Sequence, residues 1–258
     1  MSHDLRARLV RGDLLFGTML SIPSPDVAEL LGDVGFDWLF VDGEHGSFDG
    51  YELLAVLRAA GRTPCLVRTP PRHDAAIARA LDAGAAGVIV PQVHSADQAA
   101  EVAALAHFPP MGTRGVGVTR ANGYGRRAKE ALASANDTIT LVVQAESAQA
   151  VEEIEAIARV PGVDAVLVGP NDLAASLGHP GHADHPTVQS AITRIVDVCR
   201  SAARPVGIFG LNALAVQPWV ERGATLVVAG VDAVMLGDAA RGMLTALHAQ
   251  RRLDDSVS

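Results

Sequence analysis

The sequence predicts an α/β protein with the (β/α)8, or TIM, barrel fold. Two observations support this class: short apolar runs alternate with helical patterns along the whole chain, and eight such runs fit within its 258 residues. A doubly wound parallel sheet is the alternative, because alternation alone does not reveal whether a sheet closes. Eight strands, and no Gly-x-Gly-x-x-Gly motif after the first of them, favour the barrel.

The expected strands are near-continuous apolar runs, as is typical of parallel strands that are buried on both faces. Helical patterns separate them, for example at residues 25–31 and 74–81, where apolar residues recur with helical spacing. In chain order, we expect the strands at residues 14–20, 37–42, 64–68, 87–91, 139–144, 164–168, 205–209 and 225–229.

Two segments depart from this rhythm. Residues 108–137 contain Pro109-Pro110 and several glycines, and we expect them to form a long βα connection at the active face. The last segment, from Asp238 to about Arg252, is expected to form an extra C-terminal helix with a polar tail. Since no linker interrupts the chain, we expect residues 1–258 to form a single barrel domain.

The composition narrows the class of protein. A chain that is 49% hydrophobic can build a large core, and it contains no apolar run long enough for a transmembrane helix. The N-terminus lacks the apolar region of a signal peptide, and Cys65 and Cys199 are expected to be buried free thiols, which fits the cytoplasm. The net charge of −8 argues against nucleic acid as a partner.

The lysine content is the most useful single count. Lys129 is the only lysine, and it lies in a polar stretch outside every expected strand. An enzyme that forms a Schiff base needs a desolvated lysine in its pocket. The sequence therefore predicts that this chain does not use Schiff-base chemistry.

Polar residues that follow three of the apolar runs are the main candidates for chemistry. Titratable side chains are costly in a core, so they are expected where a strand emerges, and barrel active sites lie at that end of the strands. The three motifs are Asp42-Gly43-Glu44-His45, Gln144-Ala145-Glu146 and Gly169-Pro170-Asn171-Asp172.

Glu146 and Asp172 are the expected metal ligands. They follow neighbouring strands, and two carboxylates without cysteine or clustered histidine suit Mg²⁺ or Mn²⁺ completed by water and substrate oxygens. The alternative is that each is a first-turn or capping acid of the next helix. Gln144 is expected to position the substrate or a water, or to bond local backbone.

His45 is the expected general base, with Asp42 and Glu44 as carboxylates that can orient it, unless these acids simply pair with loop amides. Arg68 ends an expected strand, where its guanidinium can bind a carboxylate or an enolate oxygen. An ion pair with Asp42 is the alternative role for Arg68, and the two roles are compatible.

Two further motifs contribute candidates. Asp82 lies in the last turn of an expected helix before Gly84, a position that the helix dipole disfavours for an acid, so it needs another partner or is solvated. Backbone amides around Gly169, Pro170, Asn171 and Leu173 are expected to open a helix and to bind a substrate carboxylate.

Taken in order, these motifs resemble those of the class II pyruvate aldolases of the HpcH/HpaI type, the 2-oxo-acid or 2-keto-3-deoxy-sugar-acid aldolases. The resemblance covers nearly the whole chain. The matching stretches are Asp42-Gly43-Glu44-His45, Arg68-x-Pro70, Leu81-Asp82-Ala83-Gly84-Ala85, Gly87-Val88-Ile89-Val90-Pro91, Gly112-x-Arg114-Gly115, Gln144-x-Glu146, Gly169-Pro170-x-Asp172-Leu173 and Ser176-x-Gly178-His179-Pro180-Gly181.

The resemblance implies a TIM barrel that forms a trimer or a hexamer (a dimer of trimers), with the last helix packed on a neighbouring subunit. It assigns the metal ligands to Glu146 and Asp172, and the base to His45. It assigns enolate stabilisation to Arg68 and support of the histidine to Asp82, from the same or a neighbouring subunit.

The implied activity is reversible aldol cleavage of a 4-hydroxy-2-oxo acid to pyruvate, or a close 2-oxo acid, and an aldehyde through a metal-stabilised enolate. The metal is expected to be Mg²⁺ or Mn²⁺, with Co²⁺ as a further candidate. A lyase of citryl- or malyl-CoA and a non-catalytic 2-oxo-acid-binding barrel are the alternatives. Departures after His45 and Arg68, at residues 46–49 and 69–71, leave the aldehyde open.

Overall fold

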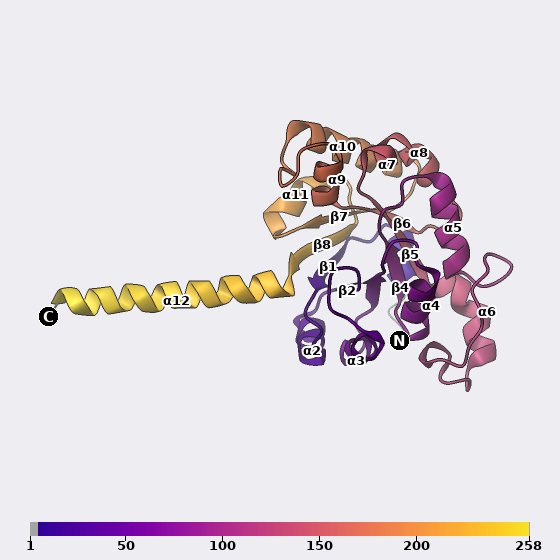
Figure 1. The fold of residues 1–258 in the computed structure, drawn as a ribbon, viewed down its shortest axis with the longest axis horizontal. Helices are drawn as coiled ribbons and strands as arrows, with labels where there is room; N and C mark the ends of the chain where they lie inside the picture. The colour runs from indigo at the N-terminus through magenta and orange to yellow at the C-terminus, as the bar shows by residue number, and fades with distance from the viewer. Residues whose placement is uncertain (1–4, 258) are drawn as a thin grey trace.

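Eight parallel strands close into a barrel in this computed structural model, which describes residues 5–257 and the side chains of residues 5–250 (Figure 1). They hydrogen-bond in the order β1-β2-β3-β4-β5-β6-β7-β8, and β8 pairs with β1. The predicted barrel is confirmed, and every strand boundary lies within two residues of its expected position. The strands are β1 (Leu15–Leu20), β2 (Trp38–Asp42), β3 (Cys65–Arg68), β4 (Gly87–Val90), β5 (Thr140–Ala145), β6 (Ala165–Val168), β7 (Val206–Gly210) and β8 (Leu226–Val231).

Helices follow the strands and cover the outside of most of the barrel (Figure 1). The two helical patterns singled out in the sequence form α2 and α4. The helices are α1 (Leu5–Val10), α2 (Pro25–Val34), α3 (Gly50–Ala59), α4 (Asp74–Asp82), α5 (Ala96–Ala106), the 3₁₀ turn η1 (Arg120–Asn122), α6 (Ala128–Thr138), α7 (Ala148–Glu152), α8 (Ile154–Ile157), α9 (Pro170–Ser176), α10 (Pro186–Ser201), α11 (Ala213–Glu221) and α12 (Asp232–Val257).

Side chains alternate along each strand between two cores. On β2, Leu39 and Val41 pack outward against the helices, whereas Trp38 and Phe40 fill the barrel interior. Because successive side chains of a strand point to opposite faces, the next inward position on β2 is Asp42. The same alternation on the other strands decides which polar residues reach the mouth of the barrel. Gly17 supports this packing, because a Cβ there would lie 2.5 Å from the Trp38 ring.

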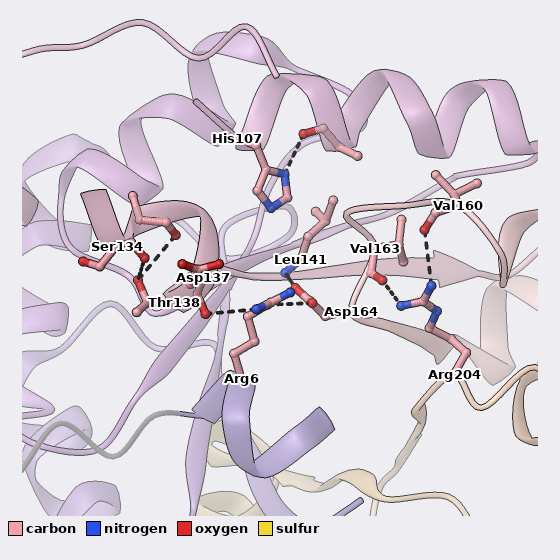
Figure 2. Close-up of polar contacts among 12 residues, drawn as sticks. Arg6, His107, Ser134, Asp137, Thr138, Leu141, Val160, Val163, Asp164 and Arg204 are labelled. Atoms are coloured by element: carbon pink, nitrogen blue, oxygen red, sulfur yellow. Dashed lines mark hydrogen bonds and ion pairs between the residues drawn. The ribbon is translucent and has the colours of Figure 1, made fainter. Parts of the chain in front are cut away.

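The N-terminal end of the barrel is closed by α1 and by paired charges. Leu5 and Leu9 of α1 join the inner core. Figure 2 shows Arg6 donating to Asp164 at 2.8 Å and to the carbonyl of Asp137 at 3.0 Å. In the same region, the Arg204 guanidinium donates to three carbonyl groups of the turn before β6, those of Ala158, Val160 and Val163.

The long segment around residues 108–137 lies at this closed end, which corrects the expectation that it borders the active face. α5 follows β4, so the chain has already returned to the N-terminal end when the segment begins, and β5 follows it. The segment is therefore an αβ connection, and it contains η1 and α6. Its proline and glycine content correctly indicated irregular structure, but not the end of the barrel at which it lies.

The C-terminal helix α12 extends away from the barrel (Figure 1). It begins at Asp232 rather than at Asp238, and the Asp232 carboxylate accepts hydrogen bonds from the amides of Ser21, Ile22 and Ala233. Its apolar side chains Met243, Leu244 and Leu247 are exposed in the single chain. The extra helix is present, as the sequence predicted.

Three smaller expectations have a clear outcome. Cys65 and Cys199 are both buried and free, as predicted. In the part of the chain that the structure describes, no helix is long and apolar enough to cross a membrane. Lys129 is an exposed residue of α6, outside every strand, so it offers no desolvated amine for a Schiff base.

Candidate active site at the mouth of the barrel

A cavity of about 350 Å³ opens at the C-terminal ends of the strands. Inward positions of several strands reach it because they continue the alternating series of the inner core. Its wall combines most of the predicted site residues with four apolar side chains. The lining consists of Met19, Phe40, Asp42, His45, Arg68, Gln144, Leu167, Gly169, Pro170, Asn171, Asp172 and Phe209.

Arg68 and Asp42 form a two-pronged ion pair on adjacent strands. They are register partners on β2 and β3, and Arg68 donates from Nε to Oδ1 at 2.9 Å and from Nη2 to Oδ2 at 2.8 Å. Burial acts to raise the pKa of Asp42, but the hydrogen bonds and charge of Arg68 outweigh it, so the pKa is lowered. Asp42 therefore stays ionised and fixes the guanidinium plane, which lies over the Phe40 ring.

Glu44 connects this pair to His45. Its Oε2 lies 3.3 Å from Arg68 Nη1 and 3.7 Å from His45 Nε2. Burial raises the pKa of Glu44, although the charges of Arg68 and His45 oppose that shift. The His45 side chain is 68% exposed at the rim, and Asp42 contacts only its backbone amide. Of the two acids expected to orient His45, only Glu44 approaches the ring.

Glu146 is a buried acid with no cationic side chain in direct contact among the described residues. Glu146 is only 6% exposed. Its Oε1 accepts a hydrogen bond from the Gln92 amide at 2.8 Å, and its Oε2 accepts one from Gln144 Nε2 at 2.6 Å. Burial raises the pKa of Glu146 to about 7, and the charges of Asp172 and Glu44 add to the rise. Several carboxylates therefore compete for the same space, which is costly unless a cation or a proton is present.

Asp172 reaches the cavity from the first turn of α9. Gly169 precedes this helix, and a Cβ at Gly169 would meet Glu146 Oε2 at 2.5 Å, so only glycine lets the helix start this close to the glutamate. Leu173, by contrast, has its side chain in the outer core and its amide bonded to the Gly169 carbonyl. The structure thus brings Asp172 to the site but leaves Leu173 with no free group for a substrate, which corrects its predicted role.

The donor set suits a hard divalent cation. Asp172 lines the cavity, and Glu146 lies beside it, bonded to the lining residue Gln144, so both can supply carboxylate oxygens; Gln144 Oε1 is buried without a hydrogen-bond partner among the described residues. Among the described residues, no group of three or more His, Cys, Asp or Glu side chains could enclose a metal ion. A cation here would thus take the rest of its coordination shell from water and substrate, which is typical of magnesium and manganese sites.

Asp82 lies away from the other candidates. It ends α4 at the N-terminal end of the barrel, where its Oδ1 accepts from Arg114 Nη2 at 2.7 Å. Both residues line a separate cavity of about 610 Å³ beside the connection from α5 to β5. Within one chain, Asp82 therefore does not approach His45, and only a second copy could bring an Asp82 to this site.

The sequence analysis missed two features of the site. Gln92 follows β4 with a φ of 54°, and this left-handed backbone directs its amide to Glu146. Its position just after an expected strand was the only available signal. The apolar wall of Met19, Phe40, Leu167 and Phe209 also went unnoticed, because these residues look like ordinary core positions in a strand.

Comparison with known proteins identifies the protein family to which this chain is similar. The profile of the HpcH/HpaI aldolase/citrate lyase family matches residues 16–239. The chain is 39% identical over 252 residues to a hydroxypyruvate/pyruvate aldolase of Paraburkholderia phytofirmans, covering 94% of this chain and 96% of the relative. It is 38% identical over 237 residues to a 4-hydroxy-2-oxovalerate aldolase of Rhodococcus jostii, with 91% and 92% coverage.

A solved structure agrees with these relatives. An HpcH/HpaI aldolase/citrate lyase family protein from Burkholderia cenocepacia superposes with a TM-score of 0.92 at 38% identity, covering 95% of this chain and 99% of that one. The chain belongs to the HpcH/HpaI aldolase/citrate lyase family. Within it, the protein is an aldolase, a lyase of carbon–carbon bonds.

Proposed function

We propose that the protein is a divalent-metal-dependent class II aldolase that reversibly cleaves a 4-hydroxy-2-oxo acid to pyruvate, or a close 2-oxo acid, and an aldehyde. One observation carries this proposal. A fixed guanidinium, an accessible histidine and the acid Asp172 line one cavity at the barrel mouth, and the buried acid Glu146 lies beside it, bonded to the lining residue Gln144. The names of the two aldolase relatives agree with a pyruvate-type substrate.

Glu146 and Asp172 would hold the cation, with Mg²⁺ or Mn²⁺ favoured by the oxygen donors and Co²⁺ as a further candidate. When bound, such a cation polarises the 2-keto group as a Lewis acid. Gln144 holds Glu146 through its amide nitrogen and presents its free Oε1 at the same place. The ligand is thereby oriented before the cation arrives.

Arg68 and His45 supply the remaining chemistry. In the cleavage direction, His45 accepts the proton of the C4 hydroxyl, the C3–C4 bond breaks, and its electron pair remains on the pyruvate fragment as an enolate. Arg68, held by Asp42, donates to the oxygen on which this charge develops. Protonation at C3 then releases pyruvate; the proton returns from His45, directly or through a water, and in the reverse direction His45 removes a proton from the pyruvate methyl group by the same route. The start of α9, at Gly169, Pro170 and Asn171, borders the place of the substrate carboxylate.

A trimer or hexamer is part of the proposal. The apolar side chains of α12 are exposed in the single chain, and such a patch is expected to be buried against a neighbouring barrel. The exposure of His45 points the same way, since a base that is shielded from water is more effective. Any contribution of Asp82 to the histidine would come from such a neighbour.

The test needs no knowledge of the aldehyde. Pyruvate is incubated with the protein in D₂O with Mg²⁺ or Mn²⁺, and the methyl signal is followed by proton NMR. We expect the signal to disappear, and EDTA to stop the loss. An unchanged methyl group with metal confirmed bound would refute a pyruvate aldolase.

A further inference from the structure

We propose that the aldehyde handled by this enzyme carries an apolar chain and no distal anionic group. The inference rests on the proposed function, because it concerns the second substrate of the same cavity. It derives from the unequal distribution of polar and apolar side chains around the barrel mouth, and from the charge balance there.

The cavity has one polar side and one apolar side. Asp42, Arg68 and Gln144 reach it from β2, β3 and β5, and they face the place of the 2-oxo acid. Phe209 reaches it from β7, which lies opposite β3 in the closed order of eight strands, and Met19 reaches it from β1. Leu167 reaches it from β6; Met19 and Leu167 belong to the inner core, and Phe209 packs against that core, so these three side chains form an apolar side of the cavity, whereas Phe40 lies under the Arg68 guanidinium.

The polar groups of β1 and of the turn after it, next to Met19, are already bonded within the protein, whereas Asn171 and Asp172, after β6, belong to the part of the cavity assigned to the cation and the 2-oxo acid. The Thr18 hydroxyl donates to the Gly230 carbonyl at 3.2 Å, and the Ser21 hydroxyl donates to Asp232 at 2.6 Å. The Ser21 and Ile22 amides are bonded to the same Asp232 carboxylate. A polyhydroxylated aldehyde placed here would lose hydrogen bonds to water and gain few in return.

The charge balance disfavours a second anion. Asp42, Glu44, Glu146 and Asp172 place four carboxylates around the site, and Arg68 is the one arginine in the cavity lining. That guanidinium is engaged by Asp42 and Glu44. A distal carboxylate or phosphate against Met19 and Phe209 would therefore find no free arginine or lysine among the side chains that line the cavity, and the lining histidine, His45, follows β2 on the side of the 2-oxo acid.

No arginine or lysine lies between β6 and α10, between β7 and α11, or between β1 and α2. Arg72 and His73 follow β3, and His94 follows β4. The histidines nearest to the apolar side, at positions 179, 182 and 185, lie between α9 and α10 and outside the cavity lining. On the apolar side, Leu211, just after β7, and Leu214, in the first turn of α11, are both exposed. The apolar surface thus continues from the cavity to the rim, along the path that an alkyl or aryl chain would occupy.

The experiment compares four-carbon acceptors in the aldol addition of pyruvate: butanal, succinic semialdehyde and erythrose. They differ in their substituents but not in chain length. We expect kcat/KM for butanal to exceed that for each of the others by at least tenfold. In the series acetaldehyde, propanal and butanal, kcat/KM should rise about fourfold per methylene, the value for burying one such group.

Variants locate the effect. Phe209→Ala should lower the ratio of butanal to acetaldehyde by roughly tenfold, consistent with loss of most of the buried contact. Phe209→Arg should shift the preference toward succinic semialdehyde. Phe16→Ala is the matched control, because Phe16 is an exposed phenylalanine at the other end of β1, outside the cavity lining, and the ratio should not change.

The outcomes separate the two proposals. Deuterium exchange into pyruvate, measured in parallel on every variant, reports the 2-oxo-acid half of the site alone. Exchange together with equal or better use of succinic semialdehyde or erythrose, or with no use of butanal, would overturn the acceptor inference and leave the aldolase standing. Absence of exchange in the metal-loaded wild type would overturn the proposed function itself.

Discussion

The two ends of the barrel each bury an acid, but they treat it differently. At the closed end, burial raises the pKa of Asp164, while the Leu141 amide and the Arg6 guanidinium oppose the rise. At the mouth, burial raises the pKa of Glu146 to about 7, and neighbouring carboxylates add to it. Asp164, at the closed end, is paired with the Arg6 guanidinium, whereas Glu146, at the mouth, has no cationic side chain in contact among the described residues.

The comparison also explains how one fold separates stability from chemistry. The closed end is plugged by α1, and its arginines donate to acids and to carbonyl groups of turns (Figure 2). The mouth keeps Glu146, Asp172 and the free Oε1 of Gln144 ready for a ligand. Substitutions at the two ends should consequently affect different measurements.

The largest expected effect is on turnover at the mouth. His45→Ala should lower kcat by roughly 10²–10⁴-fold, the usual contribution of a general base, while metal affinity stays the same. Deuterium exchange and Mn²⁺ titration measure the two quantities separately. Full turnover in this variant would remove His45 from its proposed role.

A more conservative change tests the guanidinium fork. Arg68→Lys keeps the charge but loses the two parallel hydrogen bonds to Asp42, so kcat should fall by roughly 10²-fold or more with the fold retained. Circular dichroism provides the control for folding. If Arg68→Lys turned over at the wild-type rate, a positive charge at this position would be sufficient for catalysis, and the hydrogen bonds that orient Arg68 on Asp42 would not be needed.

The pKa of Glu146 predicts a pH dependence of metal binding. Protons and the cation compete for the same carboxylate, so affinity for Mn²⁺ should increase up to tenfold per pH unit below about pH 7 and level off above it. Isothermal titration calorimetry of the metal-free protein with Mn²⁺ between pH 5.5 and 8.5 measures this pH dependence of the affinity. A constant affinity below pH 7 would contradict the assignment of Glu146.

The raised pKa of Glu146 also makes the stability of the folded protein depend on pH. Because the folded-state pKa of Glu146 is raised above its ordinary 4.5, its contribution to stability is complete below about pH 4.5 and is lost as pH rises through about 7. Metal should therefore raise the Tm most above pH 7. A metal-induced increase in Tm that is greatest at pH 5.5 would oppose this conclusion.

At the closed end, a smaller effect on stability is expected and none on turnover. Arg6→Ala removes the charged partner of Asp164 and should lower the free energy of unfolding by about 1–3 kcal/mol. Arg222→Ala, which breaks an exposed pair with Asp197, is the matched control and should cost about 0–1 kcal/mol. A loss of deuterium exchange in folded Arg6→Ala would show that the two ends are coupled.

The smallest expected effect concerns Lys129. It is exposed on α6, so borohydride added with pyruvate should neither inactivate the protein nor increase its mass. Lys129→Arg should retain full activity. A trapped adduct on the wild-type chain would instead indicate Schiff-base chemistry.

The sequence predicted the mouth better than the closed end, for a physical reason. Apolar runs mark parallel strands, and the first polar residue after such a run must lie at the strand end; Asp42 and Arg68 end β2 and β3, and Glu146 directly follows β5. The connection after α5 has no such marker. Its composition indicates irregular backbone equally well at either end of a barrel.

Other features depend on contacts that no local pattern encodes. The amide of Gln92 reaches Glu146 only through a left-handed backbone. Met19 and Phe209 line the cavity because their strands, β1 and β7, lie opposite β5 and β3 in the closed barrel. Asp82 is the opposite case, in which a local motif predicted a site residue that the fold of one chain places elsewhere. A motif identified it as a site residue, but a single chain places it beside Arg114 at the other end.

The most direct test of the difference between the two ends is a titration of metal-free protein with Mn²⁺, followed by electron paramagnetic resonance, in two matched variants. Glu146→Gln should lose binding by at least about 100-fold, whereas Asp164→Asn, the same change at the closed end, should retain the wild-type affinity. Unchanged binding in Glu146→Gln, or equal losses in both variants, would contradict the assignment of the mouth as the metal site.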